Sequence, residues 1–297
     1  MLKNFFLYLS TQRALRQWME QSPSARRMNR RFIAGNQLED GLAVVRELRQ
    51  RGLLTALDPL GENVTTEAEA AAAAANAMEA LEGAVAQEAG ATVSIKLTQF
   101  GLDLSSETAL RNVAPLVELA ASSGSRVEVD MEASMYTERT IILLEKLAGL
   151  GPVRGVIQAY LHRTAGDIDR LNRLGVPVRL CKGAYNEPPQ VAMSRKADVD
   201  ENYKRMADVL LEEGAYPAFA THDPAMIDHV LSRRPGKEQF EFQMLYGIRR
   251  DLQERLRAEG WRVRLYVPFG EAWYPYFMRR LAERPANVWF VARSLFR

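Results

Sequence analysis

The sequence predicts a (β/α)8 barrel of the TIM type within the α/β class, and three observations carry this prediction. Eight short apolar runs recur along the 297 residues, helical periodicity fills the stretches between them, and no segment rich in proline, glycine or serine divides the chain. Most of the runs end in a polar or charged side chain, and such barrels gather their active sites where the strands end. The expected strands are 53–60, 91–97, 126–131, 153–160, 177–182, 217–222, 240–245 and 263–268.

The stretches between the strands have the apolar spacing of amphipathic helices. Residues 66–89 are rich in alanine, which has the highest intrinsic helix propensity, so this segment is expected to be a helix and not a disordered stretch. Residues 1–35 look helical and basic. We therefore expect an N-terminal helical arm, 1–35, followed by one catalytic barrel domain, 36–297. The expected helices are 38–50, 66–89, 107–122, 136–150, 165–174, 198–213, 224–233, 247–259 and 272–282.

Composition argues against several classes of protein. The 39 Lys and Arg residues nearly balance the 37 Asp and Glu residues, so the net charge of +2 does not indicate nucleic-acid binding. The one cysteine, Cys181, cannot form an internal disulfide and suits a reducing cytosol. No apolar run approaches the roughly 20 residues that cross a bilayer, and no small-residue cleavage site follows the apolar stretch near the start. We expect a cytoplasmic protein.

Alternation along the strands separates two faces, because successive side chains point in opposite directions. One face is aliphatic and aromatic, and we expect it to lie beneath the helices. Its residues are Val93, Ile95, Val127, Val129, Ile157, Val178, Leu180, Phe242, Val263 and Leu265. The other face should line the barrel interior, and it carries three charges of each sign, which must pair or serve a ligand because buried unpaired charge is costly. The expected interior residues are Ser94, Lys96, Glu128, Asp130, Gln158, Arg179, Cys181, Thr221, Glu241, Gln243, Arg264 and Tyr266.

Lys96 ends one expected strand, and Asp130 ends the next. A lysine in this position could form a Schiff base with a carbonyl substrate or hold an anion. An ion pair with Asp130 would also account for it. The matching strand-end positions of the two residues favour a functional role.

The segment Arg179-Leu-Cys-Lys-Gly combines an inward arginine with a Lys182-Gly183 turn, where the backbone can approach a phosphate closely. A Lys-Gly turn alone is weak evidence, but the arginine makes a bound anion or cofactor the better interpretation. Cys181 could be a nucleophile, although no positioned base is evident in the sequence, and a small buried filler is the favoured interpretation.

Asp223 before Pro224 predicts a capped helix start, with Asp223 as the N-cap and proline in the first turn. Such a cap aims helix N–H groups at the barrel mouth, where a phosphate can bind. His222 is disfavoured as a metal ligand, because the three histidines lack the spacing that metal barrels or zincins use. We expect no metal.

Arg279 and Arg280 lie on the last expected helix. Adjacent arginines on a surface helix are usually solvated, but this helix begins at the barrel mouth among aromatic residues. Two guanidinium groups there could clamp a small carboxylate through bidentate hydrogen bonds. No Gly-x-Gly-x-x-Gly motif follows a strand, so a dinucleotide would have to be held by the barrel's own loops.

Eight motifs in this order resemble the proline dehydrogenase family, and together they span about residues 30 to 285. Arg31-Phe-Ile-Ala-Gly near the start is also similar to the family. Each motif alone is modest, but eight in register are specific. They are Ser94-Ile-Lys-Leu, Glu128-Val-Asp-Met, Gln158-Ala-Tyr-Leu, Val178-Arg-Leu-Cys-Lys-Gly-Ala-Tyr, Phe219-Ala-Thr-His, Phe240-Glu-Phe-Gln-Met-Leu, Tyr266-Val-Pro-Phe-Gly and Tyr276-Phe-Met-Arg-Arg-Leu-Ala-Glu.

The resemblance implies a barrel with non-covalent FAD that oxidises L-proline to 1-pyrroline-5-carboxylate by hydride transfer to flavin N5. It implies catalytic roles for Asp130 and Arg179, with Arg179 near N5. It implies cofactor contacts from Met131, Gln158, Arg179, Lys182, Gly183, Ala184, Thr221, His222 and Gln243. It implies that Lys96, Arg279 and Arg280 hold the substrate carboxylate, that Tyr185, Leu245 and Tyr266 wall the substrate, and that Glu283 orients the arginines.

The resemblance also implies that electrons pass to a membrane quinone, in the first step of proline degradation to glutamate. Tyr266 would favour proline over 4-hydroxyproline, because its phenol crowds the ring carbon that would carry the hydroxyl. Asp223 departs from the family pattern, in which asparagine is frequent at this position. Apolar patches at 5–9 and 289–296 could contact a membrane surface peripherally, although such patches are more often packed helices.

Two other functions are compatible with the residues. A Schiff-base aldolase would use Lys96 as its nucleophile. A non-catalytic barrel would bind a carboxylate without redox chemistry. How the substrate amine loses its proton is left open, because the sequence shows no obvious strong base.

Overall fold

The eight predicted strands form a closed parallel barrel in chain order in the computed structural model, which describes residues 12, 31–61, 64–88, 90–274 and 276–278. The strands are β1 Leu54–Pro59, β2 Thr92–Lys96, β3 Val127–Asp130, β4 Val153–Gln158, β5 Val178–Cys181, β6 Ala218–Ala220, β7 Glu241–Leu245 and β8 Val263–Phe269. Each overlaps a predicted strand, so the predicted fold is confirmed.

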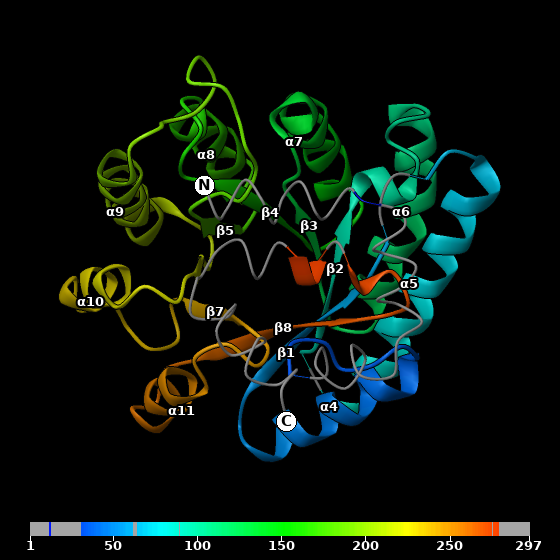
Figure 1. Ribbon diagram of the computed structural model, residues 1–297, viewed down its shortest axis with the longest axis horizontal. Coiled ribbons are helices and arrows are strands. Elements are labelled where there is room, and N and C mark those ends of the chain that lie inside the picture. Colours follow the sequence, from blue (N-terminus) through cyan, green and yellow to red (C-terminus); the bar gives the residue numbers. More distant parts are fainter. Residues whose placement is uncertain (1–11, 13–30, 62–63, 89, 275, 279–297) are drawn as a thin grey trace.

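Helices surround the strands in chain order, as Figure 1 shows. They are α4 Leu38–Gln50, α5 Glu67–Gln87, α6 Ser106–Ser122, α7 Ser134–Ala148, α8 Thr164–Arg173, α9 Lys196–Glu213, α10 Pro224–Ser232 and α11 Arg250–Ala258, with a 3-10 turn, η1, at Leu97–Phe100. Residues 273–274 and 276–278 are also helical. The helix predicted at 247–259 begins only at Arg250, because Gly247 and Arg249 adopt left-handed φ values of 74° and 53°, which interrupt a right-handed helix.

Local sequence explains where the helices begin. Thr66 caps α5 through a capping box, in which its side chain accepts from Glu69 N and the Glu69 side chain accepts from Thr66 N. Asp223 caps α10, accepting from Ala225 N at 3.1 Å, and Pro224 occupies the first turn as predicted. Because α10 begins four residues after the end of β6, its start lies at the carboxyl ends of the strands.

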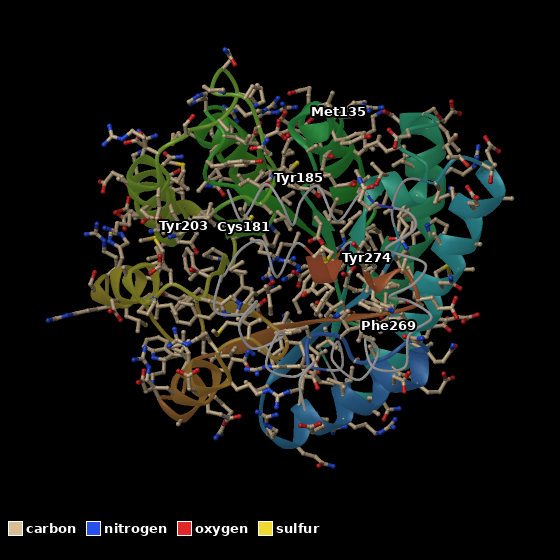
Figure 2. The ribbon with its side chains drawn as sticks, in the orientation of Figure 1. Met135, Cys181, Tyr185, Tyr203, Phe269 and Tyr274 are labelled. Atoms are coloured by element: carbon tan, nitrogen blue, oxygen red, sulfur yellow. The ribbon has the colours of Figure 1, made fainter. Side chains whose placement is uncertain are left out.

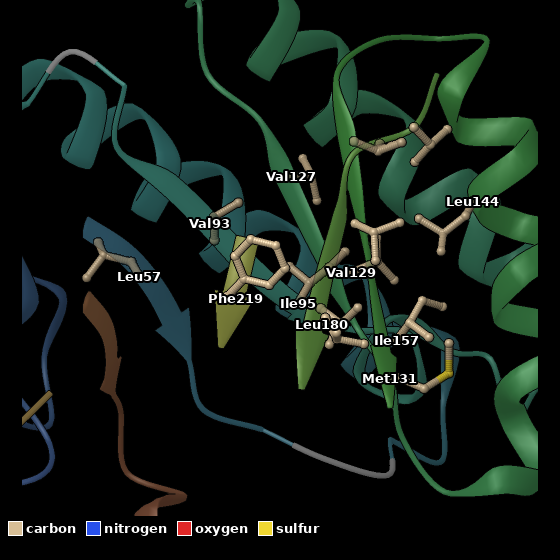
Figure 3. Close-up of a cluster of buried hydrophobic side chains, with 14 of the residues drawn as sticks. Leu57, Val93, Ile95, Val127, Val129, Met131, Leu144, Ile157, Leu180 and Phe219 are labelled. Carbon is tan, nitrogen blue, oxygen red and sulfur yellow. The ribbon is translucent and has the colours of Figure 1, made fainter. Parts of the chain in front are cut away.

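The main hydrophobic core lies between the strands and the helices. Val93, Ile95 and Val129 are among the buried residues that point from the barrel wall toward the helices (Figure 3). The ten residues predicted for this face are all buried there: Val93, Ile95, Val127, Val129, Ile157, Val178, Leu180, Phe242, Val263 and Leu265. The opposite face of the strands is consequently free to carry polar side chains into the barrel.

A second, smaller core covers part of the barrel mouth. Phe32 and Ile33 pack with Trp273, Tyr274 and Phe277, and Ala34 N donates to Pro268 O at 2.9 Å. The helical arm predicted at 1–35 lies mostly outside the described residues, as do the patches 5–9 and 289–296, so the arm and its boundary stay predictions. Within the described part of the chain, no helix combines the length and the apolar character needed to cross a membrane.

Candidate functional site

A cavity of about 430 Å³ opens at the carboxyl ends of the strands. This volume is in the range of small-molecule sites. All the predicted cofactor residues line it: Met131, Gln158, Arg179, Lys182, Gly183, Ala184, Thr221, His222 and Gln243. Asp130, Lys96, Tyr185, Leu245 and Tyr266 line it too. Arg279, Arg280 and Glu283 lie outside the described residues. The fold thus brings the described candidates together, while their roles stay predictions.

Lys96 lies at the base of the cavity between two carboxylates and is only 7% exposed. Its Nζ is 3.2 Å from Asp58 Oδ1 and 3.6 Å from Asp130 Oδ2. The expected ion pair with Asp130 is present, and Asp58 adds a second that was not predicted. Burial raises the pKa of Asp58, against the opposing effect of Lys96. Two carboxylates beside one amine form an ion-pair site, which suits a lysine that holds an anion better than a lysine that forms a Schiff base.

Tyr266 connects Lys96 to Asp130. Its hydroxyl donates to Asp130 Oδ2 at 2.7 Å and accepts from Lys96 Nζ at 3.4 Å. Burial, reinforced by the charge of Asp130, holds the pKa of Tyr266 well above its ordinary value. The phenol therefore keeps its proton at neutral pH and donates it in a hydrogen bond to Asp130.

Arg179 projects from β5 toward Asp130 from below the cavity. Its Nη1 donates to Asp130 Oδ1 at 2.8 Å, its Nε donates to Glu128 Oε2 at 3.1 Å, and its Nη2 donates to Ser94 Oγ at 3.2 Å. Burial opposes the charge on Arg179, but Glu128 and Asp130 outweigh this effect and raise its pKa. The guanidinium is therefore a fixed cation in the floor of the cavity.

A buried charge network fills the barrel beneath the site. Glu241 accepts from Arg154 Nη1 at 2.5 Å and from Arg264 Nε at 2.9 Å, and Glu128 accepts from Arg154 Nη1 at 3.3 Å. Gln243 Nε2 donates to both glutamates, at 2.7 Å to Glu241 Oε1 and 3.1 Å to Glu128 Oε2. Each of these buried charges lies beside a charge of opposite sign, which offsets the free-energy cost of removing it from water.

Sequence reasoning missed two members of this interior, Asp58 and Arg154. Both could have been found by the alternation used for the other strands. Counting back from Gln158 in steps of two reaches Arg154, and Asp58 is a polar residue near the end of the first strand. They add one charge of each sign, so the interior stays balanced.

Lys182, at the end of β5, is held by two carboxylates at the edge of the cavity. Its Nζ pairs with Asp200 on α9 and is 2.7 Å from Asp223 Oδ2. The same Asp223 caps α10 through its other oxygen. Nearby, Leu245 N donates to His222 Nε2 at 3.0 Å, which places the imidazole proton on Nδ1. Through Asp223, the ammonium group of Lys182 lies beside the N-terminus of α10.

Gly183 allows the chain to turn into the cavity. Its φ of 116° is a conformation that other residues rarely adopt, and an added Cβ would lie 2.2 Å from the Tyr160 ring. Beside it, Gln158 Nε2 donates to Glu132 O at 3.0 Å, and Ala184 N donates to Gln158 Oε1 at 3.4 Å. The amide of Gln158 is therefore oriented by backbone on both sides.

Cys181 differs from its expected role as a buried filler. It is partly exposed and lines the cavity, because it is the last residue of β5, where the packed interior gives way to the opening. Figure 2 shows Cys181 and Tyr185 on the same side of the barrel, both from the β5 end.

A closed (β/α)8 barrel with charged side chains gathered in a cavity at the strand ends is the architecture of a barrel enzyme. The model of the family described as Proline dehydrogenase matches residues 42–293. The chain belongs to the proline dehydrogenase family.

Named relatives and a solved structure agree with this assignment. The chain is 38% identical over 305 residues to proline dehydrogenase 1 of Bacillus subtilis subsp. natto, covering 100% of both chains. It is 40% identical over 277 residues to proline dehydrogenase of Deinococcus radiodurans, covering 90% of this chain and 89% of the relative. The structure of proline utilization A from Bdellovibrio bacteriovorus, inactivated by N-propargylglycine, has a TM-score of 0.79 and 27% identity. That match covers 87% of this chain but 33% of the longer protein.

Proposed function

We propose that this chain is an FAD-dependent proline dehydrogenase that oxidises L-proline to 1-pyrroline-5-carboxylate. One observation supports this most strongly: two cations, Lys96 and Arg179, flank the same carboxylate, Asp130, at the floor of one cavity. In this arrangement one cation serves a substrate carboxylate, and the other serves the redox cofactor above it.

The cavity has chemistry suited to a flavin. The left-handed φ of Gly183 lets the chain after β5 turn along the cavity wall, and Gln158 presents an oriented amide to the alternating donors and acceptors of a flavin ring. Lys182 and the N-terminus of α10 provide positive potential for its phosphates. When bound, FAD supplies an acceptor for the hydride that leaves proline C5. Arg179 stabilises negative charge that develops beside it.

The residues at the base of the cavity would orient proline. Lys96 would hold its carboxylate together with Arg279 and Arg280, which Glu283 would orient. Three cations on one anion restrict the substrate to a single pose. Tyr266 is held in place by the hydrogen bond that its hydroxyl donates to Asp130. Its phenol would crowd a hydroxyl group on the proline ring, so that proline is preferred over 4-hydroxyproline.

We further propose that a membrane quinone accepts the electrons, and that the protein works in the cytoplasm with at most a peripheral contact on the inner face of the membrane. Membership of the proline dehydrogenase family supports the proposal that a quinone is the electron acceptor. The net charge of +2 argues against nucleic acid as a partner.

The decisive experiment is a visible spectrum of the purified protein followed by anaerobic addition of L-proline. We expect a flavin spectrum, present at once or after FAD is supplied, that bleaches when proline is added. A protein that shows no flavin spectrum with added FAD, or that binds flavin without bleaching, would contradict the proposal. The second outcome would favour the non-catalytic barrel. Trapping of Lys96 by borohydride with a carbonyl substrate would favour the aldolase.

Asp223 offers a prediction about cofactor affinity. Burial raises the pKa of Asp223, but its pairing with Lys182 outweighs this and lowers it, so the residue is charged at neutral pH. Asp223→Asn keeps the α10 cap and removes an anion next to the expected phosphate site. We expect the Kd for FAD, measured by flavin fluorescence at low salt, to fall by about three- to tenfold.

Asp208→Asn is the matched control. Asp208 is 27% exposed against 29% for Asp223, and it pairs with Arg233 and His229 between α9 and α10. This change should leave the Kd unaltered. Weaker FAD binding in Asp223→Asn would show instead that Asp223 holds Lys182 in the orientation that the cofactor needs.

A further inference from the structure

The loop between β5 and α9, residues 182–195, carries Tyr185 and is fastened at several points. Near its start, Ala184 N donates to Gln158 Oε1 at 3.4 Å. Near its end, Leu161 and Ala192 form an antiparallel bridge, and Met193 N donates to Tyr160 O at 2.7 Å. The stretch that carries Tyr185 lies between these two groups of contacts.

Glu187 provides the attachment in the middle of the loop. Its Oε1 accepts from Ser134 N at 2.7 Å, and its Oε2 accepts from Ser134 Oγ at 2.5 Å. Ser134 is the first residue of α7, and the N-cap residue of this helix, Ala133, has no side chain that can cap it. The carboxylate of Glu187, 53 residues away in sequence, therefore takes the place of an N-cap.

This cap joins two parts of the molecule with different tasks. The helix α7 is part of the outer ring, whereas Tyr185 lies two residues before Glu187 and lines the cavity. In Figure 2, Tyr185 lies between Met135, in the first turn of α7, and the centre of the barrel. A bidentate attachment to a rigid helix restricts the short stretch 184–187 between its two fixed points.

We propose that Glu187 is a positioning residue for Tyr185: by binding the N-terminus of α7 it holds the pocket wall against the substrate. This inference rests on the proposed function, in which Tyr185 walls the proline ring. A purely structural role for Glu187, as a cap that stabilises α7, would predict a loss of stability with no separate effect on the pocket.

The structure offers a way to separate the two roles. Glu187→Ala removes both the cap and the attachment. Adding Ala133→Ser to it gives α7 its own N-cap, because a serine there can accept from the first-turn N–H groups. The double variant thus has a capped helix and a detached loop. Ala133→Ser alone is the reference for it.

We expect Glu187→Ala to lower Tm by about 2–4 °C and to raise the KM for proline by about three- to tenfold, with a smaller change in kcat. In the double variant Tm should recover while KM stays high. Recovery of KM together with Tm would overturn the proposal. Glu138→Ala, which removes an exposed carboxylate of the same helix that pairs with Arg163, should leave KM unchanged.

Hydrogen exchange gives a readout that does not depend on turnover. The amides of residues 184–187 should exchange at least tenfold faster in the double variant than in Ala133→Ser alone, because only the attachment differs. Equal exchange would overturn the proposal. If the wild-type protein binds FAD but is not reduced by proline, the proposed function fails, and the exchange rates still decide whether Glu187 holds the loop.

Discussion

Glu241→Gln is expected to lower the free energy of unfolding by about 3–5 kcal/mol, the cost of leaving buried charge without its partner. Glu241 is fully buried and accepts from Arg154 and Arg264, whose guanidinium groups would lose their closest anion. Glutamine has the same shape, so the effect isolates charge from packing. Urea unfolding followed by circular dichroism measures it.

The matched control is Glu238→Gln, which makes the same chemical change in an exposed pair. Glu238 is 81% exposed and lies 3.0 Å from Arg262. Exposed pairs contribute about 0–1 kcal/mol. A loss of similar size in the two variants would contradict the importance of the buried network.

The pH dependence of the stability loss in Glu241→Gln provides a second test. Burial would raise the pKa of Glu241, but Arg264 and Arg154 outweigh it and hold the pKa well below its ordinary value of 4.5. A depressed folded-state pKa contributes stability that is complete above the unfolded value and is lost as pH falls toward the folded value. The stability difference between wild type and Glu241→Gln should therefore be constant above about pH 5 and shrink below it.

Lys96→Met is expected to raise the KM for proline by about ten- to hundredfold while leaving FAD bound. Methionine keeps the length and packing of the side chain and removes the ammonium that would face the substrate carboxylate. Burial raises the pKa of Asp58, and the variant removes the Lys96 charge that opposes this rise, so Asp58 can take up a proton when its partner is lost. Steady-state kinetics together with the flavin spectrum of the purified variant measure both parts.

Lys146→Met on the exposed face of α7 is the control, and its KM should equal that of the wild type. Loss of flavin from Lys96→Met, with a normal KM in the protein that retains it, would show that Lys96 belongs to the cofactor site and not to the carboxylate site.

Much of the architecture could be predicted because the relevant signals are local. Alternation along a strand determines which side chains share a face, and this placed Glu128, Arg179 and Glu241 in the barrel before any contact was known. The first residues of α10 were predictable for the same reason, since Asp223 and Pro224 act on their own helix.

Pairing was harder to predict than placement. Lys96 was expected beside Asp130, its neighbour across two adjacent strands, and that pair is present. Arg154 and Glu241 are 87 residues apart, and their contact exists only because the barrel closes. Asp58 contacts Lys96 from β1, the strand next to β2, and this second pair was not predicted.

The sequence by itself therefore determined the eight-strand order, the polar interior and the set of residues at the strand ends, because each depends on residues close together in the chain. Only the tertiary structure decided which charges pair across the barrel and which loops are held, as with Glu187 at the start of α7. These contacts join residues that no periodicity relates, and the closed barrel brings them within hydrogen-bonding distance.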